Sequence, residues 1–188
     1  MRILDDESLL ACAAYVDLNP IRAALAETLE HSDFTSVQRR IQSIPRSDDS
    51  SRSQPRIDAV SRDCFLAPLT IDERRDSLGA CPHLAGHRCS DKGFLAISLG
   101  DYLELLDWTA RQTAPGKRGT TPADAPPIFE RLSLSGETWC ELVQNFGRLF
   151  FHVAGHPTKI EATRSRMTHR RYHTTSAART LLAASSGA

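Results

Sequence analysis

Tyr15 is the residue of this chain best placed to do chemistry. On a helix it lies roughly 120° from the centre of the apolar stripe that runs through Leu9 and Val16. A tyrosine that flanks a core stripe, near small and polar neighbours, can present its hydroxyl to solvent or to a ligand. The alternative is a boundary tyrosine, which packs its ring and leaves only its hydroxyl wet. Helix geometry alone favours this alternative.

The helix that positions Tyr15 is predicted to start at Asp6 or Ser8, whose side-chain oxygens can accept from free N–H groups of the first turn. Its apolar stripe follows the helical spacing i, i+3, i+4 and i+7. The residues of this predicted stripe are Leu9, Cys12, Ala13 and Val16.

The Asn19-Pro20 pair predicts the end of this helix and the start of the next. Pro20 lacks an N–H and disfavours a helical Asn19, so the first helix should stop near Leu18. Asn19 is then expected to cap a second helix, with Pro20 in its first position. Ile21, Leu25 and Leu29 would continue its apolar face.

A third helix is predicted from Ser36 to about Ile44, capped by Asp33 or Thr35. Its adjacent Arg39 and Arg40 can contact phosphates. A solvated helical face explains the same two arginines and is the commoner explanation.

The string from Tyr15 to Ala23, Tyr-Val-Asp-Leu-Asn-Pro-Ile-Arg-Ala, followed by Ser-Asp-Phe-Thr-Ser at 32–36, resembles the carboxyl-terminal signature of REP-associated tyrosine transposases. These are single-tyrosine HUH transposases. The resemblance covers about the first 45 residues. Segments 90–95 and 101–108 resemble a tail that a subset of these proteins carries.

The resemblance implies that Tyr15 is the position of a nucleophile, which in the family attacks a phosphate of single-stranded DNA and forms a phosphotyrosine link. It implies single-stranded or hairpin DNA as a partner, and a homodimer is possible. The residues expected to contact DNA are Asn19, Arg22, Arg39 and Arg40.

A second part of the family's machinery is missing from the sequence. The family holds a divalent ion, Mg²⁺ or Mn²⁺, on a His-hydrophobic-His pair of a sheet upstream of the tyrosine, and the ion polarises the phosphate. Fourteen residues precede Tyr15, and no His-x-His string occurs in the chain. We therefore expect a truncated, catalytically inactive transposase-like chain with no metal site of its own, whose upstream reading frame encodes the missing sheet.

Two histidine and cysteine clusters raise the question of a metal. Four candidate zinc ligands lie close together in the sequence: Cys81, His83, His87 and Cys89. Only one residue separates the two ligands of each pair, and only three residues separate the pairs, which is closer than the spacing of usual zinc sites. A loop that happens to carry these residues is the favoured alternative. The pair His152 and His156 has i, i+4 spacing but no third ligand in view.

Composition gives few constraints. The net charge is zero, so it offers no global argument for nucleic-acid binding. Five cysteines, an odd number, argue against a disulfide scaffold. Neither a signal peptide nor a membrane-spanning stretch is recognised, so no membrane association and a cytoplasmic location are expected.

The expected fold is mainly α: N-terminal helices, a flexible linker and a small C-terminal helical bundle. Helices are predicted to start after Ser98 and after Ser135, the second running to Gly155, with a short helix after Pro126 and Pro127. The expected segments are a transposase-like helical part at 1–44, a linker at 45–93, a helical domain at 94–157 and a basic, flexible tail at 158–188.

Two other functions compete with a transposase-like protein. One is a non-catalytic DNA-binding remnant that uses the basic tail and the helix at 36–44. The other is an α-helical interaction protein without nucleic acid, which would use the face of Trp139, Phe146 and Phe150 if that face were exposed.

Overall fold

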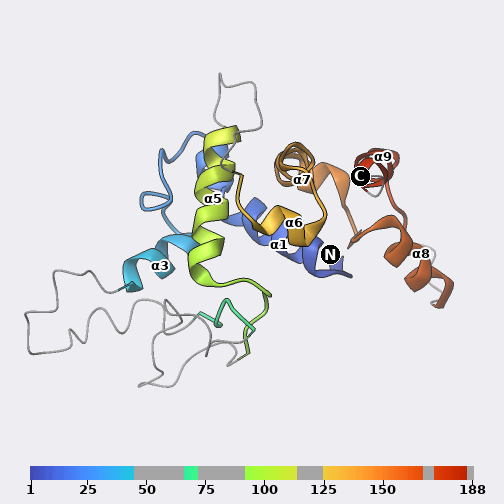
Figure 1. Cartoon of the computed structure of the whole chain (residues 1–188), viewed down its shortest axis with the longest axis horizontal. Coiled ribbons are helices and arrows are strands. Elements are labelled where there is room, and N and C mark those ends of the chain that lie inside the picture. The colour runs from blue at the N-terminus through green and yellow to red at the C-terminus, as the bar shows by residue number, and fades with distance from the viewer. Residues whose placement is uncertain (45–65, 72–91, 114–124, 167–171, 186–188) are drawn as a thin grey trace, which may run out of the picture. The chain divides into compact units, whose positions relative to one another are not determined.

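The structure, a computed structural model, describes residues 1–44, 66–71, 92–113, 125–166 and 172–185 (Figure 1). The prediction of a mainly helical chain is confirmed: this described part holds eight helices and one two-stranded sheet. No helix in it is long and apolar enough to cross a bilayer. The helices are α1 (Asp6–Asp17), α2 (Asn19–Arg22), α3 (Ser36–Ser43), α5 (Leu99–Thr113), α6 (Ile128–Leu132), α7 (Gly136–Leu149), α8 (Pro157–Arg166) and α9 (Ser176–Ser185), and the strands are β1 (Arg2–Ile3) and β2 (Val153–Ala154).

The chain divides into two compact units. Unit 1 combines Met1–Val16 with Trp108–Ala188, and unit 2 is the continuous stretch Asp17–Asp107. The linker predicted at 45–93 contributes only 66–71 and 92–93 to the described residues. The tail predicted to be flexible carries α8 and α9.

Helix α7 supplies much of the core of unit 1. The predicted start is confirmed, because the Ser135 side chain accepts from the Thr138 N–H at 3.1 Å. The Nε1–H of the fully buried Trp139 donates to Thr109 Oγ1 at 2.9 Å. The remaining buried positions of the helix recur at three and four residues, as its amphipathic pattern predicts. They are Gly136, Leu142, Val143, Phe146 and Leu149.

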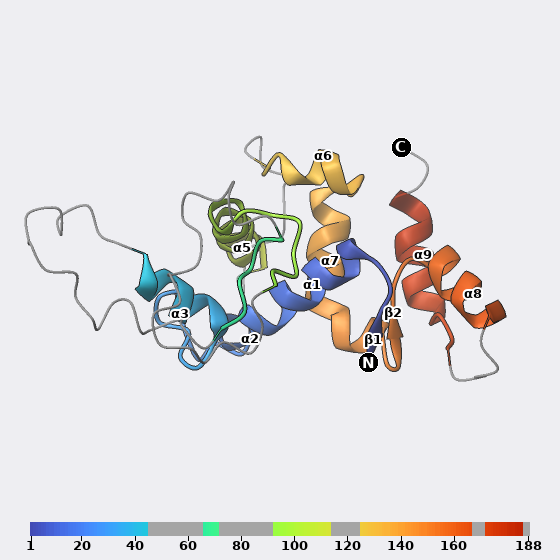
Figure 2. The same ribbon diagram turned by 90° about the horizontal axis from the view of Figure 1, so that it is seen from below.

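The predicted extension of this helix to Gly155 is wrong. The chain leaves the helix at Phe150, and β2 then pairs in parallel with β1, Arg2 opposite Val153 (Figure 2). The Arg2 N–H donates to the His152 carbonyl at 2.9 Å. The apolar spacing of the segment after Phe150 predicted that the helix continues. This segment instead pairs with β1, which lies about 150 residues away in the sequence.

Helix α9 completes unit 1 and lies against both α7 and α8 (Figure 2). Thr175 fixes its start, since its hydroxyl accepts from the Ala178 N–H at 3.1 Å. The same hydroxyl donates to the carbonyl of Leu149, the last residue of α7, at 2.9 Å. One threonine therefore caps α9 and satisfies an end carbonyl of α7.

The predicted apolar stripe of α1 is wrong. Val16 is 57% exposed, and Leu9, Cys12 and Ala13 are half-buried. The buried face instead carries Ser8, Leu10, Ala11 and Ala14. Apolar residues occur nearly all round this helix, so spacing alone does not decide which face is buried.

In unit 2, helix α5 begins as predicted. The Asp101 N–H donates to Ser98 Oγ at 3.0 Å, and Tyr102, Leu105 and Leu106 are fully buried. Ahead of this helix the chain returns past 66–71 and forms a parallel bridge between Thr70 and Leu95.

We predict that Gly93→Ala destabilises unit 2. A Cβ at position 93 would overlap the carbonyl of Thr70, so the bridge to Leu95 would have to open. We expect a loss of about 2 kcal/mol or more, measured by urea unfolding. The exposed Ala96→Ser is the matched control, and equal stability of the two variants would contradict the tight approach.

Candidate functional site

Tyr15 lies in the last turn of α1, within unit 1, and is half-buried. Its ring packs on Phe146 with the centroids 5.8 Å apart. Its hydroxyl reaches Gly147 of α7, where a Cβ would come within 3.0 Å of the phenolic oxygen. Gly147 is exposed. The ring is thus packed, as the boundary interpretation expects, and the hydroxyl lies beside an exposed edge of α7.

The Asn19-Pro20 break is present, but the predicted cap is wrong. Leu18 is the N-cap of α2 and no side chain caps this helix. The carbonyls of Leu18 and Asn19 accept from the N–H groups of Arg22 and Ala23, both at 2.9 Å. These backbone bonds restart the helix at Asn19, its exposed first residue, and Pro20, which lacks an N–H, is the second residue. The predicted apolar continuation also fails at Leu25, which is 81% exposed beyond the helix end.

The residues predicted to contact DNA differ in exposure. Asn19 and Arg39 are exposed, and Arg22 is half-buried. Arg40 is only 3% exposed, and its Nη2 donates to the Ala67 carbonyl at 2.8 Å. All four belong to unit 2, whereas Tyr15 belongs to unit 1. The structure therefore describes no common site for the five residues.

Asp17 is the residue of this region that the sequence analysis missed. It is buried, and its carboxylate accepts from Ser36 Oγ at 2.9 Å, from the Val37 N–H at 3.3 Å and from the Tyr102 hydroxyl at 2.8 Å. Thr35 Oγ1 accepts from the next N–H of α3, that of Gln38, as the predicted Thr35 cap requires. Two free N–H groups of α3 are thus satisfied, and a carboxylate stands at its positive end. One sequence signal existed: an acid in the last turn of a helix is locally unfavourable and calls for a partner elsewhere.

We predict that Asp17→Ala lowers the free energy of unfolding by about 3 kcal/mol, because it removes the acceptor of three donors, two of them on the buried residues Val37 and Tyr102. Asp17→Asn should lose less, since its amide oxygen still accepts while its NH₂ faces a donor. Urea unfolding measures both variants, with the exposed Glu27→Ala as the control. A loss no larger than that of the control would contradict the role of this carboxylate.

The metal candidates are not strengthened by the structure. Cys81, His83, His87 and Cys89 lie outside the described residues. His152 and His156 flank β2 rather than one helix, so their i, i+4 spacing is not helical. The part of the chain that the structure describes holds no group of three or more His, Cys, Asp or Glu residues able to bind an ion.

Two cysteines, Cys12 and Cys140, are half-buried and form no disulfide. Burial raises the pKa of both thiols, that of Cys140 to about 11. A raised pKa keeps a thiol neutral at physiological pH, and the thiolate is the nucleophilic form. Neither cysteine therefore suits nucleophilic catalysis.

We predict that Cys140 reacts slowly with iodoacetamide, with a thiolate fraction at pH 8 about 100-fold below that of a thiol with the ordinary pKa. Because the pKa of Cys140 is raised to about 11, its thiolate fraction, and with it the reaction rate, should keep rising between pH 9.0 and about 11. Peptide mass spectrometry at several pH values measures this rate. A plateau just above pH 9 would contradict the shift.

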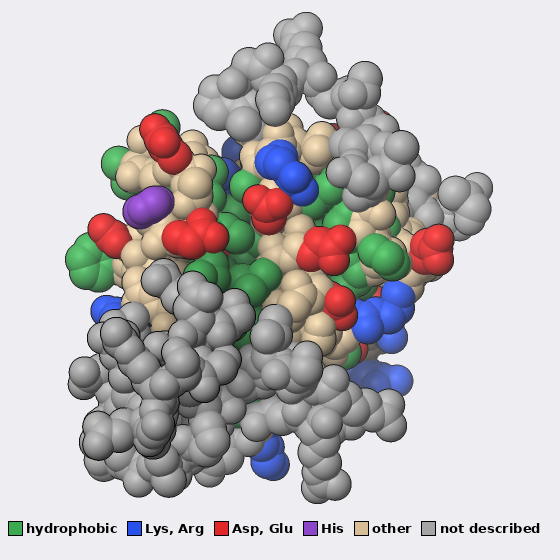
Figure 3. All heavy atoms as spheres, turned by 60° about the vertical axis from the view of Figure 1, so that its left-hand side comes forward, with side chains coloured by type: hydrophobic (Ala, Val, Ile, Leu, Met, Phe, Trp, Pro, Cys, Tyr) green, Lys and Arg blue, Asp and Glu red, His purple; other side chains and the backbone are tan. Residues whose placement is uncertain are grey.

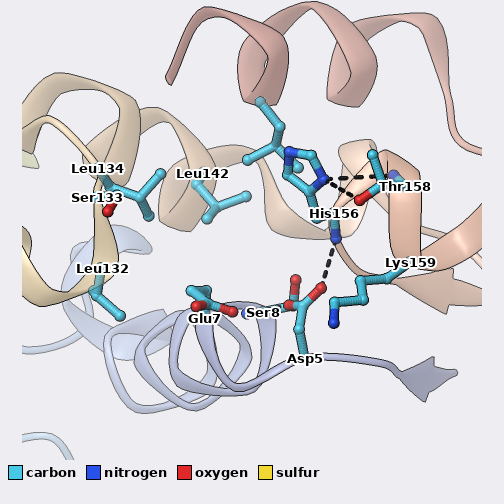
Figure 4. A pocket seen from close by; sticks show the side chains of 11 residues that line it. Asp5, Glu7, Ser8, Leu132, Ser133, Leu134, Leu142, His156, Thr158 and Lys159 are labelled. Carbon is cyan, nitrogen blue, oxygen red and sulfur yellow. Dashed lines mark hydrogen bonds between the residues drawn. The ribbon is translucent and has the colours of Figure 1, made fainter. Parts of the chain in front are cut away.

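Unit 1 also contains a cavity of about 260 Å³ (Figure 4). Leu134 and Leu142 line one wall, and Asp5, Glu7 and Lys159 line the opposite wall. This volume lies below the roughly 300 Å³ at which small-molecule sites usually begin. The volume alone therefore assigns no function to the cavity.

The Asp5 carboxylate at this cavity has a structural task. It accepts from the Ser8 N–H at 2.9 Å, which caps α1, and from the His156 N–H at 2.6 Å, just before α8. Asp5 therefore holds the starts of two helices together. The predicted cap of α1, Asp6 or Ser8, is wrong: Asp5 is the cap, and Asp6 is the first residue of the helix.

Comparison with known proteins finds no match: no family model, no curated protein and no solved structure is similar to this chain. Function must therefore be argued from the residues themselves.

Proposed function

We propose that this chain is a transposase-like protein that binds single-stranded DNA without cutting it, with Tyr15 in the position of the family's nucleophile. One observation carries the proposal: the Tyr15 hydroxyl lies beside the exposed Gly147 rather than in the core. The proposal places a phosphate at this exposed edge of α7. The string from Tyr15 to Ala23 supplies the family context.

The charge distribution favours local contacts over a broad basic surface. The net charge is zero, and the described residues on the face in Figure 3 intersperse acidic and basic side chains. Exposed cations occur instead on separate helices of unit 1. They are Arg111 on α5, Arg131 on α6, Arg148 on α7, Lys159, Arg164 and Arg166 on α8, and Arg179 on α9. Phosphate contacts by a few such groups would make binding weak and sensitive to salt.

Strand transfer is not expected, for a chemical reason. A tyrosine has a reference pKa near 10 and is a poor nucleophile until a metal or a cationic group assists it. The chain contains no His-x-His string to hold the ion that assists the family's tyrosine. Binding of DNA places no such demand on the tyrosine.

The alternative function, an interaction protein, requires the aromatic face of α7 and the residue after it to be exposed, and this face is buried. Trp139, Phe146 and Phe150 are at most 4% exposed. The DNA-binding remnant keeps its basic segment, because α8 exposes three cations, but Arg40 of α3 is turned inward. The proposed function combines this remnant with the transposase ancestry.

The test is incubation with a 5′-labelled single-stranded hairpin and Mg²⁺ or Mn²⁺. We expect DNA retention that falls roughly ten-fold between about 50 and 200 mM salt, with no covalent protein–DNA band. Tyr15→Phe should keep most of the affinity, because it removes one neutral hydrogen bond and no charge.

Two outcomes would overturn the proposal. A covalent band that Tyr15→Phe abolishes would establish an active enzyme. Failure to retain the hairpin at low salt would remove DNA from the function altogether.

A further inference from the structure

The cavity of unit 1 has two walls of different chemistry. The apolar wall consists of three leucines, Leu132, Leu134 and Leu142. The opposite wall is polar and carries the side chains of Glu7 and Lys159 (Figure 4). The lining therefore offers separate places for the apolar part and the charged part of one small molecule.

The turn between α6 and α7 explains the apolar wall. Ser133 has φ 51° and ψ 37°, the left-handed conformation that a residue with a side chain seldom adopts. The Leu134 N–H donates to the Phe129 carbonyl at 3.2 Å, and both Leu132 and Leu134 line the cavity. These two leucines are only half-buried, whereas Leu142 is 2% exposed. The turn thus leaves leucine surface at the cavity that unit 1 does not cover.

Ser8 gives an independent indication of a ligand. It lines the cavity although it is only 3% exposed. Its N–H donates to Asp5, but among the residues that the structure describes its hydroxyl has no hydrogen-bond partner. A serine within a helix commonly donates to a backbone carbonyl of the preceding turn, and a buried hydroxyl without any partner costs free energy. A polar group of a ligand in the cavity would supply this partner.

The polar wall holds one acid and one base that do not serve the fold. Glu7 and Lys159 are exposed, and within the described ranges neither side chain forms an ion pair or a hydrogen bond. The Asp5 carboxylate, in contrast, already accepts from two N–H groups. An unpaired acid and an unpaired base at one cavity suit a ligand that carries both a positive and a negative charge.

We propose that this cavity binds a free amino acid with an aliphatic side chain. The ammonium group of the ligand pairs with Glu7, and its carboxylate pairs with Lys159 and accepts from the Ser8 hydroxyl. The aliphatic side chain lies against the three leucines.

The size of the cavity agrees with this class of ligand. An apolar cavity of about 150 Å³ holds benzene, which has six non-hydrogen atoms. In proportion, the cavity of about 260 Å³ accommodates roughly ten such atoms, and leucine has nine.

Isothermal titration calorimetry with L-leucine as the probe tests the site. We expect saturable binding with a Kd of about 1 mM or lower. Isoamylamine lacks the carboxylate and 4-methylpentanoate lacks the ammonium group, so each should bind about 10-fold more weakly. L-alanine keeps both charges but lacks three side-chain carbons, and it should bind roughly 50-fold more weakly.

Substitutions on the polar wall test the two ion pairs. Glu7→Gln and Lys159→Gln should each weaken L-leucine binding about 10-fold. The matched controls are Glu141→Gln on α7 and Arg166→Gln on α8, which remove exposed charges from outside the cavity lining. Both controls should change the affinity less than two-fold.

Ser8→Ala separates a ligand-binding role from a structural one. The variant should weaken L-leucine binding about five-fold, because the ligand loses a hydrogen bond. Its free energy of unfolding, measured with urea, should not fall, because the lost hydroxyl had no partner among the described residues. A serine that served only the fold would show the reverse: lower stability and unchanged binding.

Three results would overturn the inference. The first is the absence of saturable L-leucine binding at about ten times the expected Kd. The second is binding by Glu7→Gln and Lys159→Gln that equals that of their controls. The third is equal binding of isoamylamine and L-leucine, since Lys159 would then hold no carboxylate. None of these experiments contains DNA, so their failure leaves the proposed function intact, and loss of DNA binding leaves this inference intact.

Discussion

Unit 2 depends on one buried carboxylate. Asp17 stands at the end of α1, where the helix dipole disfavours an anion, and three donors compensate for it: a hydroxyl and an N–H at the start of α3, and the hydroxyl of Tyr102 on α5. A carboxylate removed from water is costly unless its oxygens are hydrogen-bonded. The starting point of α3 and the rotation of α5 are therefore fixed together. Leu18, the next residue in the chain, is fully buried.

The string that resembles a transposase signature thus contains two kinds of residue. Tyr15 and Asp17 are two positions apart on one helix and so project in nearly opposite directions. Asp17 is committed to structure by its three donors, whereas the Tyr15 hydroxyl reaches an exposed glycine. Such a string can persist for reasons of folding alone, because one of its polar residues anchors the core. Its presence is compatible with a protein that binds and does not cut.

The sequence predicted local features well and long-range ones poorly. Caps by Thr35, Ser98 and Ser135 were predicted correctly, since a cap depends on residues three positions apart. The buried face of α1, the end of α7 and the inward turn of Arg40 were not, because each is decided by a partner distant in sequence. The same limit applies to the site. Tyr15 could be singled out from its place on a helix, but its approach to Gly147 joins residues more than 130 positions apart, and no local pattern predicts that contact.

The order of the units along the chain has a consequence for synthesis. Unit 1 takes Met1–Val16 from one part of the chain and the rest from Trp108 onward, whereas unit 2 is translated without interruption and ends at Asp107. On the ribosome, the contacts of unit 2 become available first, whereas Tyr15 of α1 must wait for Phe146 of α7, and β1 must wait for β2. Closing so long a loop is slow relative to local helix formation. During that interval Leu10 and the neighbouring alanines of α1, which are buried in the folded protein, are exposed to other chains. The protein is therefore more vulnerable during its synthesis than after it has folded.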